Sequence, residues 1–205
     1  MTATTPADLW PEVRPEAARR LLLAAVEAFA ERGYHATTTR DIATAAGMSP
    51  AALYVHYPSK AALLSEISST GHQQTLALVE AAAAAEGGPV RRMRRLVEDF
   101  TAWHARAHTI GRIVQYELHA LPPEDYAAVV ELRRRIEETV RTLISEGQAS
   151  GAFDVPDVRT AARAVLSLGI DVVRWYHERT AEPPEELGRR YADLVLRMLG
   201  APAGA

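Results

Sequence analysis

The sequence contains no cysteine, so disulfide bonds, thiolate catalysis and cysteine–zinc sites are excluded. It also lacks a long apolar run. No stretch approaches the roughly 20 apolar residues needed to cross a bilayer, and the first residues do not have the pattern of a secretory signal peptide. Apolar residues still make up 48% of the 205 positions, which is enough for a buried core. We therefore expect a soluble cytoplasmic protein of one domain or two small ones.

The sequence also lacks the basic excess of a protein that coats nucleic acid. The net charge is −3, and residues 1–60 carry six basic and six acidic side chains. Because no broad positive field is present, any affinity for DNA has to come from locally placed side chains and from dimerisation.

No stretch shows the alternation of a β-strand and no internal repeat is present, so we predict an all-α fold. The expected helices cover about 15–32, 40–46, 51–57, 59–86, 109–120, 124–150, 158–180 and 185–199, with a further amphipathic helix beginning at Val90. Gly87-Gly88-Pro89 is the clearest break. The helix over 158–180 is apolar nearly all round, which predicts burial on more than one side.

Residues 37–60, TTTRDIATAAGMSPAALYVHYPSK, have the order of a helix, a tight turn and a second helix. Thr38 or Thr39 can cap the first helix with its hydroxyl. Gly47 suits a stop at which the chain visits positive φ, and Ser49 can cap the next helix. A helix, a glycine-containing turn and a helix form the unit that places a recognition helix in the major groove of DNA.

This stretch resembles the DNA-binding core of the tetracycline-repressor (TetR) family of bacterial one-component regulators. The residues that carry the resemblance are Phe29, Gly33, Thr38, Thr39, Ile42, Ala43, Ala46, Gly47, Ser49, Leu53, Tyr54, His56, Tyr57, Lys60, Leu63 and Leu64. The resemblance implies a helix-turn-helix DNA-binding domain over residues 15–60, with its motif at about 38–57. It further implies that residues 61–200 form a helical ligand-binding and dimerisation domain.

The resemblance also implies roles within the predicted DNA-binding set. Phosphate contacts fall on Thr38, Thr39, Tyr54, Tyr57 and Lys60, positions near base edges fall on Ser49, Pro50, Ala51, Ala52 and His56, and Arg40 completes the set. Hydroxyls and a lysine fix the register on the backbone, whereas base reading needs short groups near the groove floor. Since proline and alanine side chains offer no donors, apolar contacts to thymine methyl groups are favoured.

Aromatic and polar side chains in the second half predict a ligand cavity between helices, with ordinary core as the alternative. The candidate lining residues are Phe100, Trp103, His104, Tyr116, His119, Arg174 and Trp175. Residues 174–200 also resemble a TetR subgroup that senses acyl-CoA thioesters. That resemblance implies an acyl chain among the apolar helices and a basic residue at the CoA phosphates, so an acyl-CoA is one candidate effector.

His104 and His108 stand four residues apart on one helix face, a spacing that can bind metal. His119 is the only further histidine that could join them, and pocket-lining or surface histidines are the favoured interpretation. We predict no metal site and no cofactor. No nucleophile elbow, phosphate loop or dinucleotide fingerprint is present, so nothing specific supports an enzyme.

The sequence therefore predicts a homodimeric repressor that pairs through its last two helices. A small hydrophobic effector would release it from a palindromic operator. A constitutive DNA-binding dimer without an effector pocket is the main alternative, and an enzyme is the weaker one. The effector, the operator, the regulated genes and the choice between repressor and activator are left open.

Overall fold

The computed structural model describes residue 10 and residues 13–177, 179 and 182–202. The helices are α2 (Glu16–Arg32), α3 (Thr39–Ala45), α4 (Pro50–His56), α5 (Lys60–Ala83), α6 (Pro89–Arg106), α7 (His108–Tyr116), the short 3-10 helix η1 (Leu118–Ala120), α8 (Pro123–Ala149), α9 (Val158–Trp175) and α10 (Pro184–Met198). Among these described residues no strand occurs, and the all-α prediction is confirmed. In the same part of the chain, no helix combines the length and apolar character that a membrane crossing requires.

The chain divides into two compact units. The first comprises residues 1–72 and 109–130, and the second comprises residues 73–108 and 131–205. Helices α5 and α8 each supply residues to both units. The predicted functional boundary at residue 60 is a separate matter and stays a prediction.

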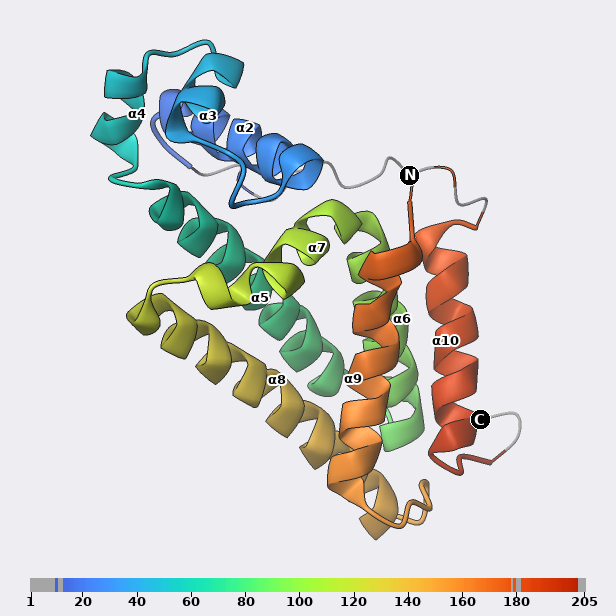
Figure 1. Cartoon of the computed structure of the whole chain (residues 1–205). Coiled ribbons are helices and arrows are strands. Elements are labelled where there is room, and N and C mark those ends of the chain that lie inside the picture. The colour runs from blue at the N-terminus through green and yellow to red at the C-terminus, as the bar shows by residue number, and fades with distance from the viewer. Residues whose placement is uncertain (1–9, 11–12, 178, 180–181, 203–205) are drawn as a thin grey trace. The chain divides into compact units, whose positions relative to one another are not determined.

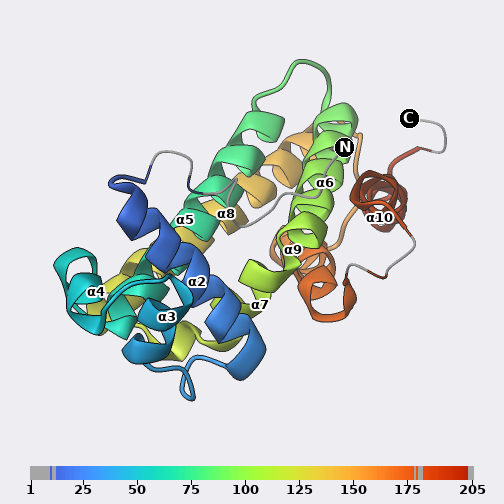
Figure 2. The same cartoon turned by 90° about the horizontal axis from the view of Figure 1, so that it is seen from above.

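Helices α2, α3 and α4 pack together in the first unit, and Figures 1 and 2 show α4 at the edge of this group. Helix α2 buries one apolar stripe that includes Leu22 and Phe29. Ile42, Ala43 and Leu53 are fully buried, so the small core expected for the DNA-binding half is present. Burial of this stripe gives the two short helices a tertiary support that their length alone would not provide.

The second unit is built on one continuous apolar cluster. It takes residues from α5, α6, α8, α9 and α10, among them Met93, Leu143 and Val195. Figure 1 shows α9 and α10 side by side, and α6 contacts both of them. The approach of α10 to α6 is close, because a Cβ added at Gly188 would lie 2.6 Å from the backbone oxygen of Glu98.

Two predicted helices end differently from expectation. The helix expected over 109–120 ends at Tyr116, since Glu117 leaves helical geometry before η1 begins. The helix expected over 158–180 ends at Trp175, because Tyr176 takes an extended conformation and its hydroxyl donates to the carbonyl oxygen of Glu182. Part of the missing stretch, residues 178 and 180, lies outside the described residues.

The prediction that α9 is buried on more than one side is wrong for the single chain. Its buried residues, such as Ala162, Val165 and Val172, recur at helical spacing and lie against the apolar core. Leu168 and Trp175 are instead 41% and 38% exposed. The apolar character of this helix therefore also covers a face that the single chain leaves open.

Candidate DNA interface and ligand-binding region

Helix α3 begins with a reciprocal cap. The hydroxyl of Thr38 accepts a hydrogen bond from the backbone N–H of Asp41 at 3.2 Å and donates to the Asp41 carboxylate at 2.6 Å. The backbone N–H of Thr38 donates to the same carboxylate at 2.9 Å. These hydrogen bonds from Thr38 lower the pKa of the Asp41 carboxyl below its usual value. The first turn of α3 is thereby fixed.

The turn and the start of α4 follow the local signals in the sequence. Gly47 has a φ of 68°, which a residue with a side chain rarely adopts. The Ser49 hydroxyl accepts from the backbone N–H of Ala52 at 3.2 Å, and Pro50 opens the helix. The predicted caps at Thr38 and Ser49 and the predicted glycine turn are confirmed.

Helix α4 presents an exposed, mainly apolar face. Leu53 is fully buried and anchors the helix, whereas Tyr54 is 53% and Val55 80% exposed. The Tyr54 hydroxyl lies 3.1 Å from the hydroxyl of Thr39, so a hydrogen bond links α4 to α3. Val55 was absent from the predicted DNA-binding set. Its spacing of four residues from the exposed Ala51 is the signal that could have found it.

The remaining members of the predicted DNA-binding set vary in exposure. Arg40 and Pro50 are exposed, while Ala52 and His56 are half-buried. Tyr57 is also half-buried, and this burial, together with the charge of Glu66, raises its pKa to about 12. Its phenol therefore stays protonated and can donate a hydrogen bond at neutral pH.

Lys60 is held by the backbone of the first unit. Its ammonium donates to the carbonyl oxygens of Tyr34 at 2.7 Å and Thr37 at 2.8 Å, with that of His35 at 3.5 Å. The same nitrogen lies 4.2 Å from the centre of the Tyr34 ring. An ammonium has three donors. A phosphate contact by Lys60 would therefore compete with these carbonyl oxygens.

The predicted ligand residues are divided between the two units. Tyr116 and His119 lie in the first unit, whereas the α6 and α9 members of the set lie in the second. Tyr116 is 64% exposed, and the exposed His119 ring stacks on Tyr126 with 5.8 Å between ring centres. Neither side chain is part of the buried core of its own unit.

Three of the predicted ligand residues are brought together on α6. Phe100 is buried, and the Nδ1 atom of His104 lies 2.8 Å from the Phe100 carbonyl oxygen. The indole N–H of Trp103 donates to the hydroxyl of Thr75 at 3.1 Å, which joins α6 to α5.

The two α9 members of the set lie at the exposed end of that helix. Arg174 is exposed and donates to the carboxylate of Asp171 at 2.8 and 3.1 Å. Trp175 is 38% exposed. A ligand-binding role for the whole set stays a prediction.

His104 and His108 both direct their Nδ1 atoms at backbone carbonyl oxygens. The Nδ1 atom of His108 lies 2.9 Å from the carbonyl oxygen of Ala105, as that of His104 does from Phe100. Since a carbonyl only accepts, each neutral ring carries its proton on Nδ1. Within the described part of the chain, no group of three or more histidine or carboxylate side chains is arranged to hold a metal ion.

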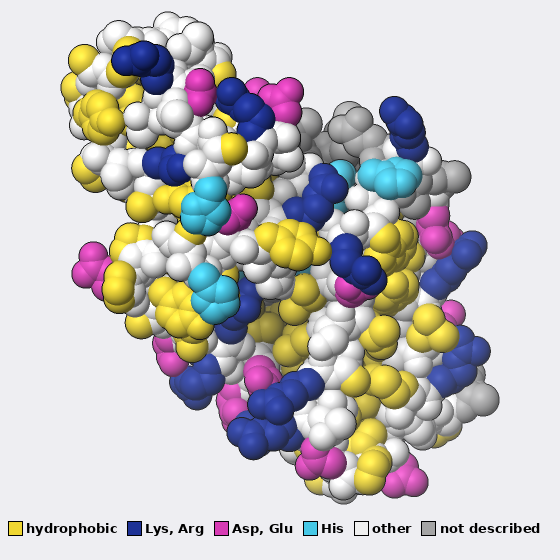
Figure 3. All heavy atoms as spheres, viewed as in Figure 1, with side chains coloured by type: hydrophobic (Ala, Val, Ile, Leu, Met, Phe, Trp, Pro, Cys, Tyr) yellow, Lys and Arg dark blue, Asp and Glu magenta, His cyan; other side chains and the backbone are white. Residues whose placement is uncertain are grey.

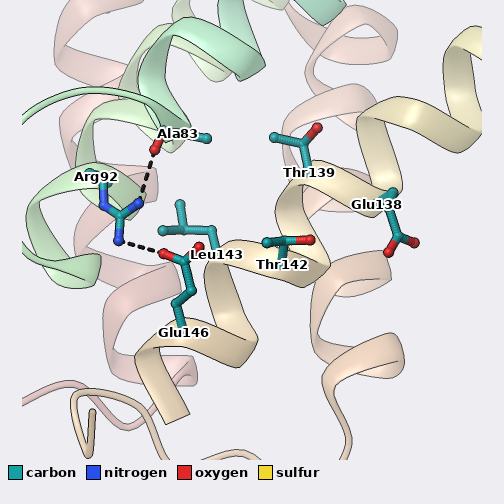
Figure 4. Close-up of a pocket in the computed structure, with 7 residues that line it drawn as sticks. All are labelled: Ala83, Arg92, Glu138, Thr139, Thr142, Leu143 and Glu146. Carbon is teal, nitrogen blue, oxygen red and sulfur yellow. Dashed lines mark hydrogen bonds and ion pairs between the residues drawn. The ribbon is translucent and has the colours of Figure 1, made fainter. Parts of the chain in front are cut away.

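A pocket of about 210 Å³ lies in the second unit and opens between the end of α5, the start of α6 and the middle of α8 (Figure 4). It is lined by Ala83, Arg92, Glu138, Thr139, Thr142, Leu143 and Glu146. The Arg92 guanidinium donates across it to the carbonyl oxygen of Ala83 at 3.0 Å and to the Glu146 carboxylate at 2.6 Å. The polar lining and the volume, which is below the usual range for ligand pockets, do not fit an apolar effector.

An apolar surface covers α9 and α10. Figure 3 shows hydrophobic side chains gathered over both helices. The large apolar side chains exposed there are Leu168, Trp175, Leu194 and Met198, each between 38% and 51% exposed. A contiguous exposed apolar face of this kind marks an interaction surface.

Family models match both halves of the chain. One described as "Bacterial regulatory proteins, tetR family" matches residues 21–67. A second, described as "Tetracyclin repressor-like, C-terminal domain", matches residues 86–199. The curated relatives include the HTH-type transcriptional repressor KstR2 of Rhodococcus jostii (strain RHA1). It is 30% identical over 187 residues, which cover 89% of this chain and 90% of the relative.

Solved structures agree with these matches. A bacterial regulatory protein in the TetR family from Rhodococcus RHA1 is 40% identical, with a TM-score of 0.86 over 92% of this chain and 99% of that one. The TetR family regulator PfmR from Thermus thermophilus is 35% identical, with a TM-score of 0.82 over 87% and 97%. These relatives are transcriptional regulators and not enzymes. The chain therefore belongs to the TetR family of helix-turn-helix, DNA-binding transcriptional regulators.

Proposed function

We propose that this chain acts as a homodimeric repressor that binds a palindromic operator and leaves it when a small hydrophobic effector binds. The observation that carries the proposal is the exposed face of α4, held on a capped and buried α3–α4 unit. The assignment as a repressor is supported by KstR2, a relative that is itself named a repressor. Two copies are needed because one nearly neutral unit lacks the positive charge for tight binding alone.

Contacts to DNA would be divided by chemistry. Hydroxyls at Thr39, Tyr54 and Tyr57 would bind backbone phosphates and set the register of α4 in the groove. Ala51 and Val55 would face base edges, where they can contact thymine methyl groups. The operator should accordingly contain thymines at the positions that face α4.

The dimer would form through α9 and α10. Their exposed apolar side chains supply a face that a second copy can cover, giving a four-helix interface about a two-fold axis. The two α4 helices would then meet half-sites about 34 Å apart, or a multiple of that spacing. The effector must bind the DNA-incompetent state more tightly than the DNA-bound state, or it shifts nothing.

A test of DNA reading begins with selection of an operator from random duplexes by the unsubstituted protein. Tyr54→Ala should then weaken operator binding roughly 100-fold, since each of two protomers loses on the order of 1–2 kcal/mol of contact. Tyr54→Phe removes only the hydroxyl and its link to Thr39, so a smaller loss is expected. A gel shift gives both affinities. If Tyr54→Ala retained the selected operator unchanged, α4 would not be the recognition helix.

The effector is the less constrained part of the proposal. One relative is titled a ketosteroid transcriptional regulator, KstR2 of Mycobacterium tuberculosis. AibR was solved with isovaleryl coenzyme A and operator DNA, although at 23% identity its likeness to this chain concerns the fold. These titles and the resemblance of residues 174–200 support acyl-CoA thioesters as the first class to test.

A thermal-shift screen of acyl-CoAs of increasing chain length, ketosteroids, lipophilic drugs and metal ions should identify the sensed class. A ligand present at 100 times its dissociation constant adds about 2.7 kcal/mol to the free energy of unfolding, which raises the melting temperature by several degrees. The active compound should also release the protein from its operator. If no compound shifts the melting temperature while the operator is still bound, the alternative of a constitutive DNA-binding dimer is favoured.

A further inference from the structure

The turn that joins α2 to α3 is gripped from both sides at one residue. The carbonyl oxygen of Tyr34 accepts a hydrogen bond at 2.7 Å from the ammonium of Lys60, the first residue of α5. The backbone N–H of Tyr34 donates at 3.4 Å to the carboxylate of Glu117, the residue between α7 and η1. Tyr34, Lys60 and Glu117 all belong to the first compact unit. One peptide segment thus connects three elements that are far apart in the sequence.

The turn has little freedom to absorb a displacement. The Thr37 hydroxyl lies 2.8 Å from the Gly33 carbonyl oxygen and 3.1 Å from that of Ala28, and Thr37 is buried. The Tyr34 ring is also buried and packs edge-on against Phe29 with 5.2 Å between ring centres. Thr38, the cap of α3, follows directly. A shift of Tyr34 would therefore move the start of the helix-turn-helix.

Glu117 is suited to hold this turn. Its side chain is only 21% exposed, and its second carboxylate oxygen lies 3.8 Å from Nε2 of His35, a contact that becomes an ion pair when that imidazole is protonated. Burial and the charge of Glu117 raise the pKa of the Tyr34 phenol. Glu117 also lies where the backbone leaves the geometry of α7, so a change in that joint changes where its carboxylate can reach.

We propose that Glu117 is a positioning residue for DNA binding: its carboxylate holds the Tyr34 turn and so sets the placement of α3 and α4. This inference rests on the proposed DNA-binding function of α4. It assigns Lys60 a share in the same clamp, because the lysine grips the other side of the same residue. A contact between Glu117 and DNA is not required.

The sign of the effect separates positioning from simple electrostatics. Removing a negative charge from a DNA-binding unit strengthens its attraction to phosphates, so Glu117→Ala should bind DNA more tightly if charge alone mattered. If Glu117 positions the turn, the same substitution weakens operator binding by about fivefold or more, a typical size for coupling between sites. Glu117→Gln keeps an oxygen that can accept from Tyr34 and should recover most of the loss.

The experiment measures operator affinity by gel shift for the unsubstituted protein, Glu117→Ala, Glu117→Gln and a matched control, Glu124→Ala. Glu124 is an exposed acid of the same unit, so its substitution removes the same charge. Melting temperatures without DNA are measured in parallel, and binding is measured well below them. The Gln variant against its control also provides the comparison if the Ala variant does not fold.

The expected result is weaker operator binding for Glu117→Ala, recovery in Glu117→Gln, and unchanged or tighter binding for Glu124→Ala. Operator binding by Glu117→Ala that equals or exceeds that of Glu124→Ala would overturn the inference, even if the melting temperature fell. In the comparison limited to the Gln variant, binding weaker than the Glu124→Ala control supports it and binding as tight overturns it. Failure of the unsubstituted protein to select any operator would instead remove the proposed function.

Discussion

Replacing Leu168 and Leu194 by glutamate in one chain should convert the protein to a monomer and weaken operator binding by at least about 100-fold. The two side chains lie on α9 and α10 and are 41% and 51% exposed in the single chain. In a two-fold interface each introduced carboxylate would be buried close to its symmetry mate, and an unpaired buried charge costs several kcal/mol. The dimer should therefore dissociate without loss of the protomer fold.

The loss of DNA binding follows from the loss of the second copy. Binding of two linked modules exceeds that of either alone by about 10²–10⁴, because the second contact becomes intramolecular. The near-neutral charge of residues 1–60 offers little nonspecific attraction to compensate for it. Light scattering or a sizing column gives the oligomeric state, and a gel shift on the selected operator gives the affinity.

Val130→Glu provides the matched control. Val130 is 42% exposed and lies on α8, outside the apolar face of α9 and α10. It adds the same charge at a similar exposure, so dimer and operator affinity should both be retained. A double glutamate variant that still elutes as a dimer would place the interface elsewhere. A monomer with undiminished operator affinity would show that pairing is not what completes DNA recognition.

Local signals in the sequence were sufficient for the helix-turn-helix. Thr38, Gly47 and Ser49 act within three or four residues of themselves, through caps and a positive φ, so their roles can be read from neighbouring residues alone. The family resemblance, carried by residues 29–64, is confirmed by the match over residues 21–67.

Contacts between distant residues could not be read in the same way. Lys60 meets the carbonyl of Tyr34 across 26 positions, and Glu117 meets its N–H across 83. Each residue type is common on solvated helix faces, and nothing beside it in the sequence marks a partner. The end of α9 at Trp175 was missed for a related reason, since the next proline is Pro183 and the bond that turns the chain comes from Glu182.

Gly188 illustrates how tertiary packing decides what a residue does. A glycine inside a helix is destabilising relative to alanine by about 1 kcal/mol, so local propensity alone favours Gly188→Ala. The structure predicts the opposite. An added Cβ would lie 2.6 Å from the Glu98 carbonyl oxygen and 3.2 Å from its carbonyl carbon and Cα, all of which are backbone atoms of α6. Backbone in the middle of a helix cannot swing aside as a side chain can.

Gly188→Ala should therefore lower the free energy of unfolding by about 2–3 kcal/mol, the usual cost of overpacking a close contact. Helix α10 would have to move away from α6, its most extensive partner, and so disturb the cluster around Val195 and Leu196. Thermal or urea unfolding measures the change. Because the apolar face of α10 would shift with the helix, weaker dimerisation should accompany the loss of stability.

Gly88→Ala is the control for the glycine itself. Gly88 caps α6 with a φ of −73°, and nothing lies within 4 Å of an added Cβ there. Replacing a glycine cap by alanine should change stability by only a few tenths of a kcal/mol. The difference between the two variants isolates the contact with Glu98 from the effect of glycine on the unfolded chain, which both variants share. Equal stabilities would mean that α10 does not approach α6 as closely as the packing at Gly188 requires.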